Sequence, residues 1–270
     1  MALKIFSHSG HIGNVLYSLP CIKILSGDEG AIIYLKEVFE DHRGHINGNC
    51  GAEGENYTQF MALKDLLLLQ PYIREVIKYV PPPGYDYSPG MWRGIKMDYD
   101  LDRSRGQNKR RYIFHVQRYF DAFGITEDWR NHIPWLTIDN KGYRFILDEN
   151  APAGIREEKY AIFHITDRWH GFLPDWTKIY RQELCKYDHI YFTGYRHDYE
   201  KFESRYSTMM DYLPTDTLLD LARVVRDSQA VYTNQNCCLV ICQALGKRYY
   251  LARNADRTHC HTGLLNETLI

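Results

Sequence analysis

The sequence lacks the features that mark several broad classes of protein. No apolar run approaches the ~20 residues that a membrane-spanning helix needs, and no signal-type segment precedes the strand-like residues Leu3–Phe6. The 7 cysteines include no C-x-x-C pair, which favours reduced thiols and a cytoplasmic location. A formal net charge of −1 gives no electrostatic reason to bind nucleic acid, whose phosphates attract basic surfaces. We therefore expect a cytoplasmic globular protein with no transmembrane segment and no nucleic-acid partner.

Metal-binding patterns are also scarce. The D-x-D stretch within Asp98–Asp102 is short and common by chance, although some glycosyltransferases hold a metal with such a pair. His259 and His261 have no second ligand pair at the spacing of a metal site. We expect no metal and no other cofactor.

Short strand patterns alternate with helix patterns along the chain. The expected strands are Leu3–Phe6, Ala31–Leu35, Val76–Val80, Tyr160–Ile165, His189–Thr193, Ala230–Thr233 and Arg248–Leu251. The expected helices are Asn14–Leu25, which Pro20 should kink, Thr58–Leu69, Lys109–Phe123, Trp176–Lys186, Asp216–Asp227 and Cys237–Leu245. This alternation predicts an α/β fold with parallel sheets. The polar stretch Asp148–Glu158 is the expected linker between domains at residues 1–150 and 151–270.

Two strand-to-helix turns of similar design lie near opposite ends of the chain. The first spans Ser7–Asn14 and the second Ala230–Asn236, and each joins a short apolar strand to a helix pattern. A helix N-terminus presents N–H groups and the positive end of a dipole, which suit phosphate. Two such units predict two doubly wound halves that face each other across a cleft.

The residues of these turns resemble a known family. Gly10–Pro20 is similar to the opening motif of heptosyltransferase-type glycosyltransferases, roughly G-x-x-G-D, a hydrophobic pair, one residue, then [ST]-L-P. Thr215–Ala222, Ala230–Gln235 and Gln243–Lys247 resemble the half of that family that binds the donor. The resemblance implies a GT-B fold of two Rossmann-like domains, with the acceptor held by the first and a nucleotide-sugar by the second. It also implies that no divalent metal is needed.

The chain departs from the family pattern at both turns. The resemblance implies a carboxylate as general base in the first turn, but that position is Asn14 here, and the family's carboxylate in the second turn falls near Gln235. An amide cannot take a proton from an acceptor hydroxyl. His11 and His8 lie in the first turn, and imidazole has a suitable pKa. We favour His11 as the base, with Asn14 positioning the acceptor, although both histidines could be ordinary polar loop residues.

The remaining candidate residues come from the resemblance and from their places at strand ends. The donor-binding candidates are Arg168, Thr193, Gly194, Asp216, Thr217, Asn234, Gln235 and Asn236. The acceptor-binding candidates are Gly10, Gly13, Asp102 and Arg105. Plain structural roles compete with several of these assignments. Thr215 or Asp216 is expected as a helix N-cap, and Gly194 could be a simple turn glycine. Capping requires only one of the three consecutive amides at 234–236.

We interpret the chain as a hexosyl- or heptosyltransferase of inverting, metal-independent type, acting on a glycan or glycoconjugate hydroxyl. The lost carboxylates leave open a non-catalytic protein that binds a nucleotide-sugar or glycan. A dinucleotide-dependent oxidoreductase is a weaker alternative. It is weaker because the first turn lacks G-x-G-x-x-G and no acidic residue ends the second strand pattern.

Overall fold

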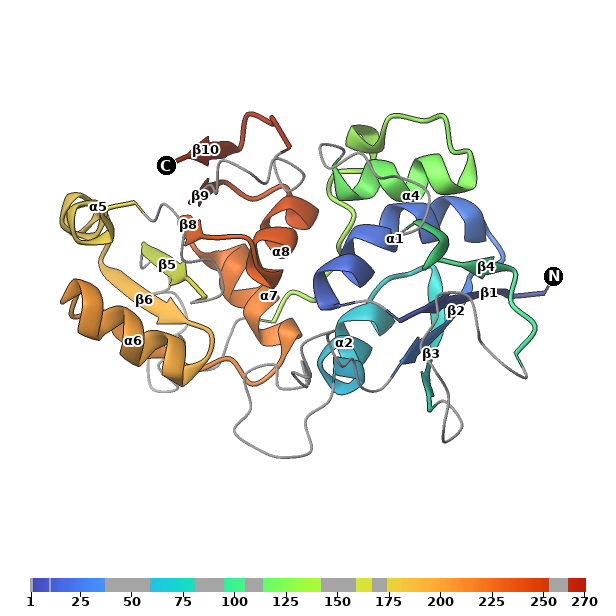
Figure 1. Ribbon diagram of the computed structural model, residues 1–270, viewed down its shortest axis with the longest axis horizontal. Helices are drawn as coiled ribbons and strands as arrows, with labels where there is room; N and C mark the ends of the chain where they lie inside the picture. Colours follow the sequence, from blue (N-terminus) through green and yellow to red (C-terminus); the bar gives the residue numbers. More distant parts are fainter. Residues whose placement is uncertain are drawn as a thin grey trace.

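The protein is an α/β molecule with two parallel sheets, each accompanied by helices (Figure 1). The computed structural model describes residues 2–9, 11–36, 59–80, 95–104, 114–141, 159–166, 174–252 and 262–270. The four-stranded sheet has the order β3-β2-β1-β4. Its strands are β1 (Lys4–His8), β2 (Ala31–Lys36), β3 (Ile73–Tyr79) and β4 (Tyr99–Asp100), and all its neighbours pair in parallel. This is the order of one doubly wound half.

The second sheet has six strands in the order β10-β9-β8-β5-β6-β7. They are β5 (Tyr160–His164), β6 (His189–Thr193), β7 (Asp211–Leu213), β8 (Ala230–Thr233), β9 (Tyr249–Leu251) and β10 (Glu267–Leu269). The chain builds outward from β5 through β6 and β7, then crosses to β8 on the other side. The predicted parallel, doubly wound sheets are therefore confirmed within the described residues.

The helices follow the expected alternation, with differences at their ends. They are α1 (Ile12–Ser26), α2 (Gln59–Leu68), α4 (His115–Phe123), the 3-10 helix η1 (Trp129–His132), α5 (Trp176–Glu183), α6 (Arg196–Tyr206), α7 (Leu218–Asp227) and α8 (Cys237–Leu245). The helix α1 continues through Pro20, so that proline does not end it. No helix within the described ranges is both long and apolar enough to cross a bilayer.

Four helices join the two sheets through a shared apolar cluster, and a second cluster lies on the six-stranded sheet alone. The helix α1 packs against α8, and α2 packs against α7, so α7 and α8 face α1 and α2 in Figure 1. Fully buried side chains from both halves, such as Leu16 on α1 and Ile241 on α8, belong to one cluster. Burial of apolar area favours this contact by about 25 cal/mol per Å². The relation between the two sheets is therefore fixed by packing as well as by chain connections.

Residues 133–141 cross between the halves and are bonded to both. Backbone N–H groups of Trp135 and Leu136 donate to the carbonyl of Ala244 at the end of α8, at 2.9 and 3.2 Å. The side chain of Gln70 and the backbone of Thr137 exchange two hydrogen bonds of 2.9 Å. These bonds hold the segment between the end of α8 and the chain that follows α2.

An ion pair extends this attachment to α7. Both Arg223 Nε and Nη2 donate to the carboxylate of Asp139, at 2.9 and 2.6 Å. The pair lowers the pKa of Asp139, chiefly through the hydrogen bond from Arg223. The expected linker at 148–158 lies outside the described residues.

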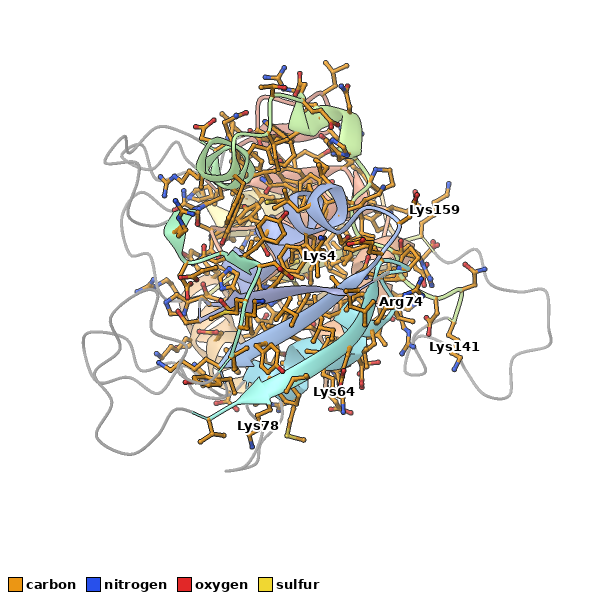
Figure 2. All side chains as sticks on the ribbon, turned by 90° about the vertical axis from the view of Figure 1, so that its right-hand side faces the viewer. Lys4, Lys64, Arg74, Lys78, Lys141 and Lys159 are labelled. Atoms are coloured by element: carbon orange, nitrogen blue, oxygen red, sulfur yellow. The ribbon has the colours of Figure 1, made fainter. Side chains whose placement is uncertain are left out.

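The strand β3 forms one edge of the four-stranded sheet and carries exposed charge. Arg74 and Lys78 lie near opposite ends of this strand in Figure 2. Charged side chains on an edge strand oppose pairing with another chain. These charges protect the edge against pairing with another chain.

Candidate functional site

The carboxyl ends of the parallel strands place most of the candidate residues. In the four-stranded sheet the winding direction changes between β1 and β4, and in the six-stranded sheet between β5 and β8. In open α/β sheets, ligands bind outside the carboxyl ends of the strands at such a change of direction. The first turn follows β1 and the second follows β8, so both lie at these points.

Buried polar side chains hold the β1–α1 turn. Both carboxylate oxygens of Asp102, which follows β4, accept from the N–H of Ser9, at 3.3 and 3.1 Å. His8 Nδ1 lies 3.8 Å from Asp102 Oδ1, and both side chains are almost completely buried. The carboxylate of Asp102 thus supports the turn from inside the protein, which differs from the acceptor contact that the sequence suggested.

A tyrosine hydroxyl extends this buried group to α1. Tyr119 on α4 donates to the carbonyl oxygen of Asn14 at 3.0 Å, and its oxygen lies 2.8 Å from His8 Nε2. Because the hydroxyl has one hydrogen, it accepts from His8, which therefore carries a proton on Nε2. Since His8 is 1% exposed, an acceptor substrate does not reach it.

His11 and Asn14 occupy the more accessible part of the same turn. His11 is the N-cap of α1, but its side chain makes no capping hydrogen bond. Both residues are partly exposed, and the first turn of α1 has no acidic residue. Of the two candidate histidines, His8 is buried and His11 is partly exposed.

The D-x-D carboxylates attach β4 to β1. Asp98 Oδ2 accepts from the N–H of Ile5 at 2.8 Å, and Asp100 Oδ1 accepts from the Ser7 hydroxyl at 3.3 Å. Burial is the main cause that raises the pKa of Asp100. No group of three His, Cys, Asp or Glu able to hold a metal occurs in the described part of the chain.

Asparagine side chains hold the β8–α8 turn from within. Asn236 is the N-cap of α8, and its Oδ1 accepts from the N–H groups of Cys238 and Leu239, at 2.9 and 3.3 Å. Asn234, which is 2% exposed, donates to the carbonyl of Thr166 at 2.7 Å and accepts from its N–H at 3.3 Å. Two of the three amides expected to bind the donor therefore fix the turn, and Gln235 between them stays partly exposed.

The two turns lie at the same end of a helix pair. A Cβ on Gly13 would come within 3.4 Å of Val240 Cγ2 on α8. One turn further along α1, the Tyr17 hydroxyl donates to Gln243 Oε1 at 2.8 Å. Both contacts advance in the same direction along α1 and α8, so these helices run parallel with their N-termini together. Gly13 permits this close approach of the helices, and its assignment to the acceptor side remains a prediction.

The ends of β6 and β7 carry the next candidates. Thr193 is fully buried, and its hydroxyl lies 3.3 Å from that of Thr215. The N-cap of α7 is Thr217, which accepts from the N–H of Asp220 at 3.0 Å, while Asp216 is exposed. The sequence expectation of Thr215 or Asp216 as the cap was wrong. Thr217 caps the helix because its hydroxyl accepts from the N–H of Asp220, three residues further on, and donates to the Asp220 carboxylate.

One residue at this edge was missed by the sequence analysis. His164 is the last residue of β5, is 5% exposed, and has a pKa lowered by burial to about 4. Its ring lies against Gly194, whose φ of 126° favours glycine. The sequence signal that could have identified His164 is a polar residue at the end of an apolar strand. Gly10, Arg105 and Arg168 lie outside the described residues, so their assignments remain predictions.

Solved structures share this architecture. No protein-family model and no curated protein matches the sequence. A glycosyl transferase family 9 protein from Veillonella parvula has 11% identity and a TM-score of 0.64, covering 100% of this chain and 87% of its own. The E. coli ADP-heptose lps heptosyltransferase II has 14% identity and a TM-score of 0.60, covering 99% and 90%. The chain shares their fold.

A third structure gives the same result. The E. coli heptosyltransferase WaaC with ADP-2-deoxy-2-fluoro heptose has 13% identity and a TM-score of 0.57, covering 98% of this chain and 92% of that one. The heptosyltransferase resemblance of the sequence motifs is thus confirmed at the level of the fold, along nearly the whole chain.

Proposed function

We propose that this protein is a glycosyltransferase that moves a hexosyl or heptosyl group from a nucleotide-sugar to an acceptor hydroxyl. The observation that carries the proposal is the parallel packing of α1 and α8, which brings the two turns to one end of the helix pair. The shared heptosyltransferase fold supports it. Residues 1–150 would contribute the acceptor side of a GT-B cleft, and residues 151–270 the donor side.

In the proposed reaction, the acceptor oxygen attacks the anomeric carbon while the bond to the diphosphate breaks. The acceptor proton passes to His11, and the nucleoside diphosphate leaves with the bonding electrons, which inverts the anomeric centre. Asn14 orients the acceptor hydroxyl through its amide. His8 and Asp102 support the turn without touching the substrate, because both are buried.

The leaving diphosphate is neutralised without a metal in this proposal. The N-terminus of α8 contributes a positive dipole end, and Gln235 lies partly exposed beside it. Arg168 is the candidate cation. A preorganised set of donors can stabilise charge that develops in the transition state as a metal ion does elsewhere.

Thermal unfolding with a panel of nucleotides and nucleotide-sugars tests the proposal. A ligand that binds the folded state raises the midpoint, so one nucleoside diphosphate and its sugars should raise it equally with magnesium or with a chelator. His11→Ala should keep that shift but lose sugar transfer. His189→Ala, at the amino end of β6, should keep both.

The loss of the family's carboxylates at Asn14 and Gln235 favours one alternative, a non-catalytic binding protein. It predicts the same ligand shift with no transfer to any acceptor and no hydrolysis of the bound sugar. A shift with NAD alone would contradict both transferase and nucleotide-sugar binding.

A further inference from the structure

A fully buried amide makes a polar contact between α1 and α8 inside their apolar interface. Gln243 on α8 is 0% exposed, and its Oε1 accepts from the Tyr17 hydroxyl on α1 at 2.8 Å. Its neighbours on α8, Ile241, Cys242 and Ala244, are buried apolar residues. An apolar side chain would fill the place of Gln243 without the cost of burying an amide. The amide therefore calls for a role that apolar packing does not supply.

The orientation of this amide is set from the far side of the second half. Gln243 Nε2 donates to the Tyr249 hydroxyl on β9 at 3.2 Å, and Tyr249 donates to Oε2 of Glu267 on β10 at 2.6 Å. The N–H and hydroxyl of Thr262 hold the same carboxylate oxygen, at 3.0 and 2.9 Å. A tyrosine hydroxyl has one hydrogen, so Tyr249 can only accept from Gln243. The amide oxygen is thereby directed towards Tyr17.

The bond from Tyr17 fixes where α1 lies along α8. Attraction between apolar side chains has no preferred direction, so apolar contact by itself lets two helices slide. A hydrogen bond weakens steeply when its geometry is lost, so it opposes such sliding. His11 is the N-cap of α1 and Asn14 lies in its first turn. A shift of α1 would therefore move both candidate residues relative to the β8–α8 turn.

We infer that Gln243 is a positioning residue for the proposed transfer, setting the register of α1 on α8 and so aligning the two turns. The inference rests on the proposed function. Gln243 is too deeply buried to touch a substrate, so it acts through Tyr17 and α1. Donor binding in the second half does not need this bond, whereas transfer needs both turns in place at once. Small displacements of reacting groups cost a large part of the rate.

Release of nucleoside diphosphate by Tyr17→Phe and Gln243→Met tests this role, with the parent's best substrate among ADP-, GDP-, UDP- and CDP-linked sugars as the probe. Tyr17→Phe removes one hydroxyl and keeps the ring that packs against Phe114 and His115. Gln243→Met replaces the amide by an apolar chain of similar length. Each variant should lower kcat by about tenfold or more, with the KM for the donor close to that of the parent.

Tyr160→Phe is the matched control. The Tyr160 hydroxyl donates to the carbonyl of Val224 at 3.0 Å, which is a buried bond within the second half. Its loss should lower the thermal midpoint about as much as Tyr17→Phe does, while kcat stays near that of the parent. If Tyr160→Phe lowers kcat as much as Tyr17→Phe, turnover follows stability alone and the positioning role fails.

Gln243→Glu tests the direction of the hydrogen bonds without a measurement of turnover. The titratable groups that face the new carboxyl are Tyr249 and Glu267 beyond it, and Tyr17 with His115 stacked on its ring. When ionised, the new group competes with Glu267 for the one hydrogen of Tyr249, which should lower the thermal midpoint. When protonated, it can donate to Tyr249 and accept from Tyr17 as the amide does.

The deficit in thermal midpoint of Gln243→Glu against the parent should therefore shrink as the pH falls from about 9 to about 5, since burial raises the pKa of a carboxyl. The parent has the same neighbouring groups, so the difference reports the new carboxyl. A deficit that does not change with pH would overturn the direction that we assign.

The outcomes separate this inference from the proposed function. If the parent releases nucleoside diphosphate and both Tyr17→Phe and Gln243→Met release it at the same rate, the inference fails and the proposed function stands. Tyr17→Phe decides the matter if Gln243→Met does not fold. If the parent releases none from any of the four classes of sugar, the proposed function and the positioning role both fall.

Discussion

The β1–α1 and β8–α8 turns have the same design but are held in different ways. The second turn is fixed from within, because Asn236 caps α8 and Asn234 binds the backbone of Thr166. In the first turn, the N-cap His11 makes no side-chain capping bond. Support comes instead from Asp102, which binds the Ser9 N–H, and from Tyr119, which binds the carbonyl of Asn14.

This difference fits separate roles for the two turns, with donor binding at the second and proton acceptance at the first. Asn236 already occupies two N–H groups at the start of α8, so that turn is a rigid platform, and Gln235 beside it is partly exposed. The side chains that support the first turn are buried beneath it, which leaves His11 and Asn14 nearer the surface. A rigid donor platform opposite an accessible proton acceptor suits the transferase that we propose.

The largest effect is expected at the rigid turn. Asn234→Ala removes the amide that binds Thr166 and leaves buried backbone groups unpaired, which should cost about 3 kcal/mol. Urea unfolding measures the loss. Asn234→Asp keeps an acceptor oxygen and, when its carboxyl is protonated, can also donate, so at acidic pH it should cost less than Asn234→Ala. If Asn234→Ala unfolds like the parent, this turn is not held from within.

The pH dependence of the unfolding free energy tests the burial of His164, whose carbonyl is bonded to the same turn. The folded-state pKa of His164 is about 4, below its ordinary value of 6.5. The unfolded chain therefore binds the proton first, and stability falls as the pH drops from 6.5 towards 4. At pH 5 the linkage amounts to about 2 kcal/mol. In urea unfolding, the parent should lose about 2 kcal/mol more than His164→Leu between pH 7 and pH 5. Equal losses in the two proteins would contradict the burial of a neutral imidazole at this position.

A smaller loss of stability is expected at the β1–α1 turn, which residues from β4 and α4 support. Tyr119→Phe removes the hydroxyl between His8 and the Asn14 carbonyl and should cost about 1–2 kcal/mol. Tyr99→Phe is the matched control, because Tyr99 packs against Phe6 through its ring. Equal unfolding free energies for the two variants would contradict the support that we assign to Tyr119.

The smallest effect is expected from adding a carboxylate at the N-terminus of α1 or of α8. Asn14→Asp places a carboxylate in the first turn of α1, which has no acidic residue, and should add about 0.3–1 kcal/mol. Gln235→Glu should add less, since Asn236 already caps α8. The gain should shrink in high salt. A larger gain from Gln235→Glu would reverse the comparison.

Most of the fold could be predicted from periodicity and turn residues. The strands His189–Thr193 and Ala230–Thr233 and the helix Cys237–Leu245 occur at the expected bounds. The strands β4, β7 and β10 were not expected, because two or three residues are too few to show an alternating pattern. The helix α6 was also missed, since its sequence is dominated by charged and aromatic residues.

The site was less predictable than the fold, because its roles depend on contacts between distant residues. The sequence identified the amides at 234–236 but not that Asn234 would bind Thr166, 68 positions earlier. His164 gained its interest only from its packing against Gly194. Spacing along the chain shows which residues share an edge, whereas burial and pairing show which of them remain available to a ligand.

The central claim is that the two turns form one transferase site, and release of nucleoside diphosphate from nucleotide-sugars tests it most directly. The measurement uses the parent protein, His11→Ala and the control His189→Ala, with a chelator present and candidate acceptors added. We predict release by the parent and by His189→Ala, and at least tenfold slower release by His11→Ala at saturating donor. Donor binding by the parent without any release, or equal release by His11→Ala, would contradict the claim.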